Sequence, residues 1–124
     1  MKPIRLLSIC LCLFFVTCTK DNNSSVQIRI ENISQSDFTD VYADTSGGTH
    51  DFGDVKAGHT SDYASFDMAY RYAYIQLKVG TQVYTLQPID YVGETPLEEG
   101  NYTYAIDVVD PNSEYGLGLE LKVD

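Results

Sequence analysis

The sequence has few cysteines, and they all lie at one end of the chain. Cys10, Cys12 and Cys18 are the only three, so none remains after residue 18. This excludes disulfides within any later domain, and with them thiolate zinc sites, thiol redox chemistry and a cysteine nucleophile. A domain built from the rest of the chain must be stabilised by burial alone.

Basic residues are also scarce. Eight Lys and Arg stand against eighteen Asp and Glu, which gives a net charge of −10. Two of the eight, Lys2 and Arg5, lie in the first 17 residues, so the remainder carries 6 minus 18, or −12. Such a surface repels phosphate backbones, so we expect no nucleic-acid partner, whereas cations or basic partners would be attracted.

Motifs for catalysis are absent as well. The sequence has no Gly-x-Ser-x-Gly elbow, no phosphate-binding glycine loop and no dinucleotide fingerprint. Adjacent Glu98 and Glu99 do not make a glycosidase pair, because neighbouring side chains usually diverge. We therefore expect a protein that is not an enzyme and has no cofactor; a small hydrolase built from Asp-rich loops is the alternative.

The first 17 residues predict a secretory signal. Lys2 and Arg5 precede an apolar run of 11 residues, Leu6–Val16, and polar residues follow from Thr17. A helix needs roughly 20 residues to cross a bilayer, whereas a signal core has about 7 to 15. The run therefore indicates export rather than a transmembrane anchor.

The sequence Phe15-Val16-Thr17-Cys18 resembles the lipobox of bacterial lipoproteins. Together with the polar tether that follows it, the motif is similar to lipoproteins of the Bacteroidetes group. The resemblance implies cleavage after residue 17, acylation of Cys18 and attachment to the outer membrane through a tether at residues 18–25. Whether the periplasmic or the cell-surface side is occupied stays open, and a plain secretory signal is the alternative.

Residues 26–124 predict short strands separated by turns. Val26, Ile28 and Ile30 alternate with polar residues, which is typical of a strand with one buried face. Similar patterns predict strands at Phe38–Thr45, Thr60–Phe66, Ala69–Val79, Gln82–Leu86, Tyr102–Asp110 and Leu117–Asp124, with a hairpin turn at Gly80-Thr81. No window has a sustained helical period. Seven or eight strands in about 100 residues predict an all-β fold, a single antiparallel β-sandwich.

The segment around Tyr102 sharpens this prediction. Leu97 to Tyr104, with Gly100 before Tyr102, resembles the tyrosine corner of immunoglobulin-like domains, in which a tyrosine hydroxyl bonds back to the preceding loop. Tyr104 stands where antibody domains have a cysteine. The resemblance therefore implies a generic immunoglobulin-like or transthyretin-like sandwich, with Tyr102 in a structural role.

Two sets of residues could hold a metal ion. His50 and His59, the only histidines, flank a predicted hairpin in which Asp54 pairs with His59. Their spacing matches no zinc motif, so we interpret them as a solvated cross-strand pair. Seven Asp residues between Asp37 and Asp67 could suggest calcium, but they lack the spacing of an EF-hand loop. We therefore predict no metal site, and calcium held by several loops stays an alternative.

Alternating tyrosines form the most distinctive outward pattern. Tyr70, Tyr72 and Tyr74 are expected on the face of one strand opposite Ile75 and Leu77. Such a face could bind a protein or a glycan, because tyrosine combines contact area with a polar tip; it could equally stabilise the sheet. The leading hypothesis is a lipid-anchored binding or accessory module of the cell envelope, and a carbohydrate-binding module using the tyrosine face is the alternative.

Overall fold

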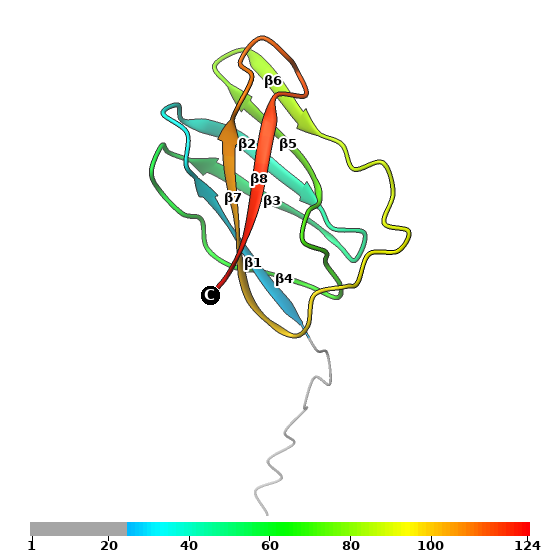
Figure 1. Cartoon of the computed structure of the whole chain (residues 1–124). Helices are drawn as coiled ribbons and strands as arrows, with labels where there is room; N and C mark the ends of the chain where they lie inside the picture. The colour runs from blue at the N-terminus through cyan, green and yellow to red at the C-terminus, as the bar shows by residue number, and fades with distance from the viewer. Residues whose placement is uncertain (1–24) are drawn as a thin grey trace, which may run out of the picture.

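The computed structural model describes residues 25–124, which form eight β-strands (Figure 1). The strands are β1 (Val26–Asn32), β2 (Phe38–Asp44), β3 (Thr49–Val55), β4 (Ala64–Phe66), β5 (Tyr74–Val79), β6 (Gln82–Leu86), β7 (Gly100–Val108) and β8 (Leu117–Val123). The predicted signal peptide and Cys18 lie outside the described residues. Within residues 25–124, no helix has the length and hydropathy needed to cross a membrane.

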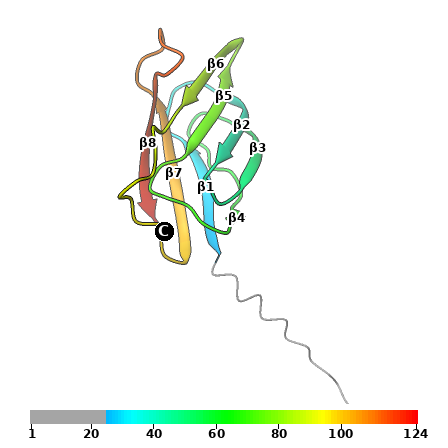
Figure 2. The same cartoon turned by 90° about the vertical axis from the view of Figure 1, so that its right-hand side faces the viewer.

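The strands form two four-stranded sheets that face each other (Figure 2). One sheet has the order β4-β1-β7-β8 and the other β3-β2-β5-β6. Every neighbouring pair is antiparallel except β1 and β7, which are parallel. The predicted all-β sandwich is confirmed.

The strand order differs from that of constant-type immunoglobulin domains. There the first two strands share a sheet, whereas here β1 and β2 lie in different sheets, joined by residues 33–37. The likeness to immunoglobulin domains therefore covers the two-layer architecture but not the order of the strands.

Alternating residues of both sheets fill the space between them. The burial of β1 alternates as predicted, and Val41 and Ala43 of β2 point inward. Tyr104 is the largest fully buried side chain; its hydroxyl donates to the Tyr70 carbonyl oxygen, and burial raises the pKa of the phenol far above its ordinary range. Each fully buried aliphatic or phenylalanine side chain contributes about 1.5–3 kcal/mol, so burial can hold a fold that has no disulfide after residue 18.

The predicted hairpin between β5 and β6 is confirmed. Val79 and Gln82 are partners across a two-residue loop, Gly80-Thr81. Gly80 has a φ of +61°, which fits the first central position of a type II′ turn.

Two predicted strands begin later than expected. β5 begins at Tyr74 rather than Ala69, and β4 spans only Ala64–Phe66 rather than Thr60–Phe66. The backbone before β5 is hydrogen-bonded to the connection between β6 and β7 instead of to a strand. The Leu97 N–H donates to the Ala69 carbonyl at 2.8 Å. The last strand lies where it was predicted, and Val123 is 77% exposed at the end of edge strand β8.

The predicted pairing of Asp54 with His59 is also wrong. β3 pairs with β2, whereas β4 pairs with β1 in the other sheet, so residues 56–63 cross between the sheets. A turn at Lys56 to Gly58 is compatible with both arrangements, because a turn does not determine which strand the following segment pairs with.

Candidate functional site: a cleft between the second sheet and loop 87–99

Tyr70 and Tyr72 do not continue the face of β5. Both lie before the strand, and their rings stack against Tyr91, which belongs to the long connection between β6 and β7. The ring centroids of Tyr70 and Tyr91 are 4.3 Å apart with 13° between the planes; those of Tyr72 and Tyr91 are 5.5 Å apart at 19°. The two tyrosines therefore contact a loop rather than form an open platform.

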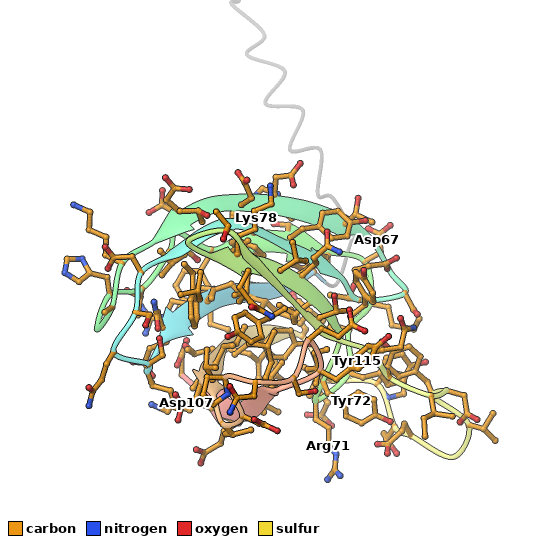
Figure 3. All side chains as sticks on the ribbon, turned by 90° about the horizontal axis from the view of Figure 1, so that it is seen from above. Asp67, Arg71, Tyr72, Lys78, Asp107 and Tyr115 are labelled. Atoms are coloured by element: carbon orange, nitrogen blue, oxygen red, sulfur yellow. The ribbon has the colours of Figure 1, made fainter. Side chains whose placement is uncertain are left out.

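Polar contacts fix the same loop against the body. The Tyr72 hydroxyl donates to the Asp90 carbonyl oxygen at 3.2 Å, and the Arg71 guanidinium lies 3.8 Å from a Glu94 carboxylate oxygen. In Figure 3, Arg71 points away from the body while Tyr72 lies beside the ribbon of this loop. Together with the Leu97 to Ala69 backbone bond, these contacts attach residues 87–99 at several positions.

Tyr74 is the one residue of the predicted tyrosine face that lies on β5. It is the cross-strand partner of Asp44, the last residue of β2, so both side chains project from the outer face of the second sheet. The Tyr42 ring of β2 meets Tyr74 edge to face, with centroids 6.2 Å apart. Strand pairing thus places an aromatic ring and a carboxylate side by side.

A hollow of about 360 Å³ opens between this part of the sheet and the loop. We call it the tyrosine cleft. Its lining comes from the end of β2 and the turn after it, from the start of β5 and from the first part of loop 87–99: Asp44, Ser46, Tyr74, Gln87, Pro88, Ile89, Asp90 and Tyr91.

The surroundings of the cleft keep the Tyr91 phenol in its protonated form. Burial raises the pKa of Tyr91 above its ordinary value. The Asp44 carboxylate adds to the rise, and the Ser46 side chain opposes it. Tyr91 therefore stays protonated at neutral pH and can donate a hydrogen bond. None of the lining side chains is positively charged.

Sequence reasoning missed Tyr91, and it did not connect Asp44 with Tyr74. An aromatic residue in a polar loop, such as Tyr91, indicates that the loop packs against the rest of the domain. The sequence does not reveal its stacking partners, because they lie about twenty positions earlier in the chain. The pairing of Asp44 with Tyr74 depends on β2 lying next to β5, which the spacing of the strands does not specify.

The other residues singled out from the sequence have separate surroundings. The Tyr102 hydroxyl donates to the Glu98 carbonyl oxygen at 2.7 Å, the backward bond that defines a tyrosine corner. The His50 ring packs edge to face on Phe52, with centroids 4.7 Å apart, whereas His59 lies in the turn after β3.

The Asp-rich segments bind backbone groups rather than gather around one point. The Asp37 carboxylate accepts from the Ala57 N–H at 3.0 Å, and the Asp44 carboxylate from the Ser46 N–H at 2.9 Å. Among residues 25–124, no three His, Cys, Asp or Glu side chains converge as metal ligands would.

Comparison with known proteins gives a fold and no family. No protein-family model matches the chain, and no curated protein matches it significantly. A solved structure, the NMR structure of a protein from Eubacterium rectale, is similar with a TM-score of 0.56 at 12% identity, over 84% of this chain and 92% of that one. At this identity the likeness supports the fold alone.

Proposed function

We propose that the protein is a non-enzymatic binding module of the bacterial cell envelope, held to the outer membrane by lipid on Cys18. The observation that carries this proposal is the lipobox-like sequence that ends at Cys18, eight positions before β1 begins at Val26. Several acyl chains on one cysteine would hold the sandwich at a membrane almost permanently, since each buried methylene contributes about 0.8 kcal/mol.

The placement of side chains supports binding over catalysis. The acidic side chains of the described sandwich are spread over loops and strand faces, so we do not propose the hydrolase alternative. In the tyrosine cleft, polar and aromatic groups converge on a concave surface, which is the kind of surface that binds a ligand. The proposal includes a relationship to lipoproteins of the Bacteroidetes group and to transthyretin-like sandwiches.

Metabolic labelling with a palmitate analogue tests the anchor. We expect the wild-type chain to take up label and Cys18→Ala to take up none, because the acylated sulfur is removed. Cys10→Ala and Cys12→Ala are matched controls that should stay labelled. Label on Cys18→Ala, or its loss from either control, would contradict the assignment.

Protease treatment of intact cells then reports the side of the membrane. Digestion of the anchored chain in intact cells indicates the cell surface, and digestion only after the outer membrane is opened indicates the periplasmic side. Retention of the wild-type chain in the soluble fraction would contradict outer-membrane attachment.

A further inference from the structure

We infer that the tyrosine cleft binds an uncharged saccharide, with the sugar hydroxyls on Asp44 and Gln87 and a sugar ring against Tyr74. The inference rests on the proposed binding role and supplies its ligand class, but it does not depend on the lipid anchor. It also moves the site away from the tyrosine face expected from the sequence, since Tyr70 and Tyr72 stack against Tyr91.

The cleft offers polar groups with free capacity. One Asp44 carboxylate oxygen accepts from the Ser46 N–H, and the other accepts no hydrogen bond from residues 25–124. The Gln87 amide, which can donate and accept, belongs to an exposed residue that lines the cleft, and it makes no hydrogen bond to residues 25–124. A carboxylate beside an amide satisfies sugar hydroxyls, which both donate and accept.

The cleft also offers apolar surface. Tyr74 is held edge to face by Tyr42, and Pro88 and Ile89 line the adjoining side, with Ile89 99% exposed. Such surface fits the C–H face of a sugar ring, just as the polar groups fit its hydroxyl edge. A volume of about 360 Å³ lies at the small end of the range of roughly 300–1,000 Å³ for ligand pockets, so we expect one or two sugar units.

Charge narrows the ligand further. Phosphorylated and carboxylated ligands are disfavoured because the lining has two carboxylates and no Lys or Arg, in a chain of net charge −10. An organic cation is the competing ligand, since Asp44 and Asp90 would attract it. However, the Gln87 amide and the Tyr91 phenol both offer hydrogen-bond donors. Sugar hydroxyls can accept from these donors, whereas a cation cannot.

The site is held in place before any ligand arrives. Stacking of Tyr70 on Tyr91, the Tyr72 bond to the Asp90 carbonyl and strand pairing of Asp44 with Tyr74 hold the three contributing segments. Binding then has a small ordering cost, which allows weak polar contacts to give measurable affinity.

An NMR titration of the full chain in a nonionic detergent that has no sugar headgroup tests the inference. The probes are glucose, galactose, mannose and N-acetylglucosamine, with glucosamine as the charged counterpart of glucose. We expect at least one neutral sugar to give saturable shifts of the backbone amides of residues 44–46, 74, 87 and 89–91. Glucosamine should bind no more tightly than glucose.

Two variants should weaken that binding at least tenfold: Gln87→Ala, which removes the amide, and Tyr74→Leu, which removes the ring. Their matched controls are Gln35→Ala and Tyr115→Leu, exposed residues that do not line the cleft and should bind as wild type does. Unchanged melting temperatures separate lost binding from lost folding; if Tyr74→Leu unfolds, Gln87→Ala still decides.

Three results would overturn the inference. One is the absence of saturable shifts with all four neutral sugars. Another is a set of shifts confined to the hollow at the opposite end of the sandwich, which is lined by Ser36, Val79 and Pro111 among others. The third is tighter binding of glucosamine that Asp44→Asn abolishes, which would indicate a cation site. None of these bears on palmitate labelling of Cys18, so the anchor and the ligand fail separately.

Discussion

At the scale of single residues, several polar side chains stabilise the fold through hydrogen bonds that the sequence does not reveal. Asn32 is fully buried at the end of β1; its amide donates to the Ser36 carbonyl at 2.7 Å and to the Val55 carbonyl at 2.9 Å. Its own oxygen accepts from the Ser34 N–H at 2.9 Å. Because a buried polar group must be paired, these bonds fix the turn from β1 to β2.

A second cluster of this kind surrounds Asp124. The Tyr63 hydroxyl and the Thr103 hydroxyl both bond to its carboxylate, and the Arg29 side chain lies 3.5 Å from it. The hydrogen bond from Tyr63 is the main cause that lowers the pKa of Asp124 below its ordinary 3.8, followed among the stabilising groups by Thr103 and Arg29. The same bond raises the pKa of Tyr63 above 10.0.

These two shifts predict how stability depends on pH. The lowered pKa of Asp124 means that its contribution is present above about pH 3.8 and is lost as the pH falls through the folded-state pKa. The raised pKa of Tyr63 means that its contribution is present below about pH 10.0 and is lost as the pH rises through the folded-state value. Melting curves of wild type, Asp124→Asn and Tyr63→Phe from pH 2 to 11 measure both.

We expect each variant to melt below wild type near pH 7. The deficit of Asp124→Asn should shrink in acid, and that of Tyr63→Phe should shrink in strong base. Tyr115→Phe, at an exposed tyrosine that precedes β8 whereas Asp124 follows it, should follow wild type throughout. A deficit that is constant across the whole range would show that the cluster does not depend on charge.

At the scale of elements, strands were predictable where one face is buried and the other is wet. β1 shows this most clearly, since its burial alternates over the whole strand, Val26–Asn32. Alternation failed before β5, because Tyr70 and Tyr72 have the spacing of a strand face but are held by the loop after β6. Local sequence cannot supply that partner, because Tyr91 becomes a neighbour only once the sheets have formed.

The same reason explains the misplaced hairpin at residues 54–59. A turn between two polar segments predicts that they pair, but β4 pairs with β1 in the other sheet. Of the candidate site, Tyr74 was predictable as an outward residue of a strand, whereas the cleft around it depends on loop 87–99 and on the order of the sheet.

The stacking of Tyr70 and Tyr72 on Tyr91 predicts that loss of the Tyr91 ring detaches the whole of loop 87–99 from the sandwich. Tyr91→Leu removes both stacked contacts, and an aromatic pair contributes about 0.5–1.5 kcal/mol beyond burial. We expect a loss of about 1–2 kcal/mol in the free energy of unfolding and faster amide exchange in residues 87–99. Urea denaturation and hydrogen exchange measure the two effects.

Val92→Ala is the matched control for that experiment. Val92 is the next residue of the loop and is 88% exposed, so its truncation should change the free energy of unfolding by less than about 0.5 kcal/mol. Exchange in β1 and β7 should be unchanged in both variants when local opening dominates. Wild-type exchange in the loop of Tyr91→Leu would show that the stack does not hold it.

At the scale of the whole molecule, charge repulsion opposes the compact state. The chain has a net charge of −10, and only four ion pairs lie among residues 25–124, most of them partly exposed. Exposed pairs contribute about 0–1 kcal/mol each. The distance over which charges interact falls from about 30 Å at 0.01 M salt to about 8 Å at 0.15 M.

Salt should therefore stabilise this protein, because it screens repulsion among many acidic groups and weakens only a few attractive pairs. We expect the melting temperature to rise by several degrees between 0.01 and 0.15 M NaCl at pH 7; for a domain of this size about 1 kcal/mol corresponds to roughly 4–8 °C. The double variant Asp51→Asn, Asp62→Asn removes two charges from exposed residues and should show a smaller rise. A melting temperature that falls with salt would mean that the ion pairs outweigh the repulsion. A rise shared equally by the double variant would point to a salt effect other than screening, and then the acidic surface would not limit the stability of the sandwich.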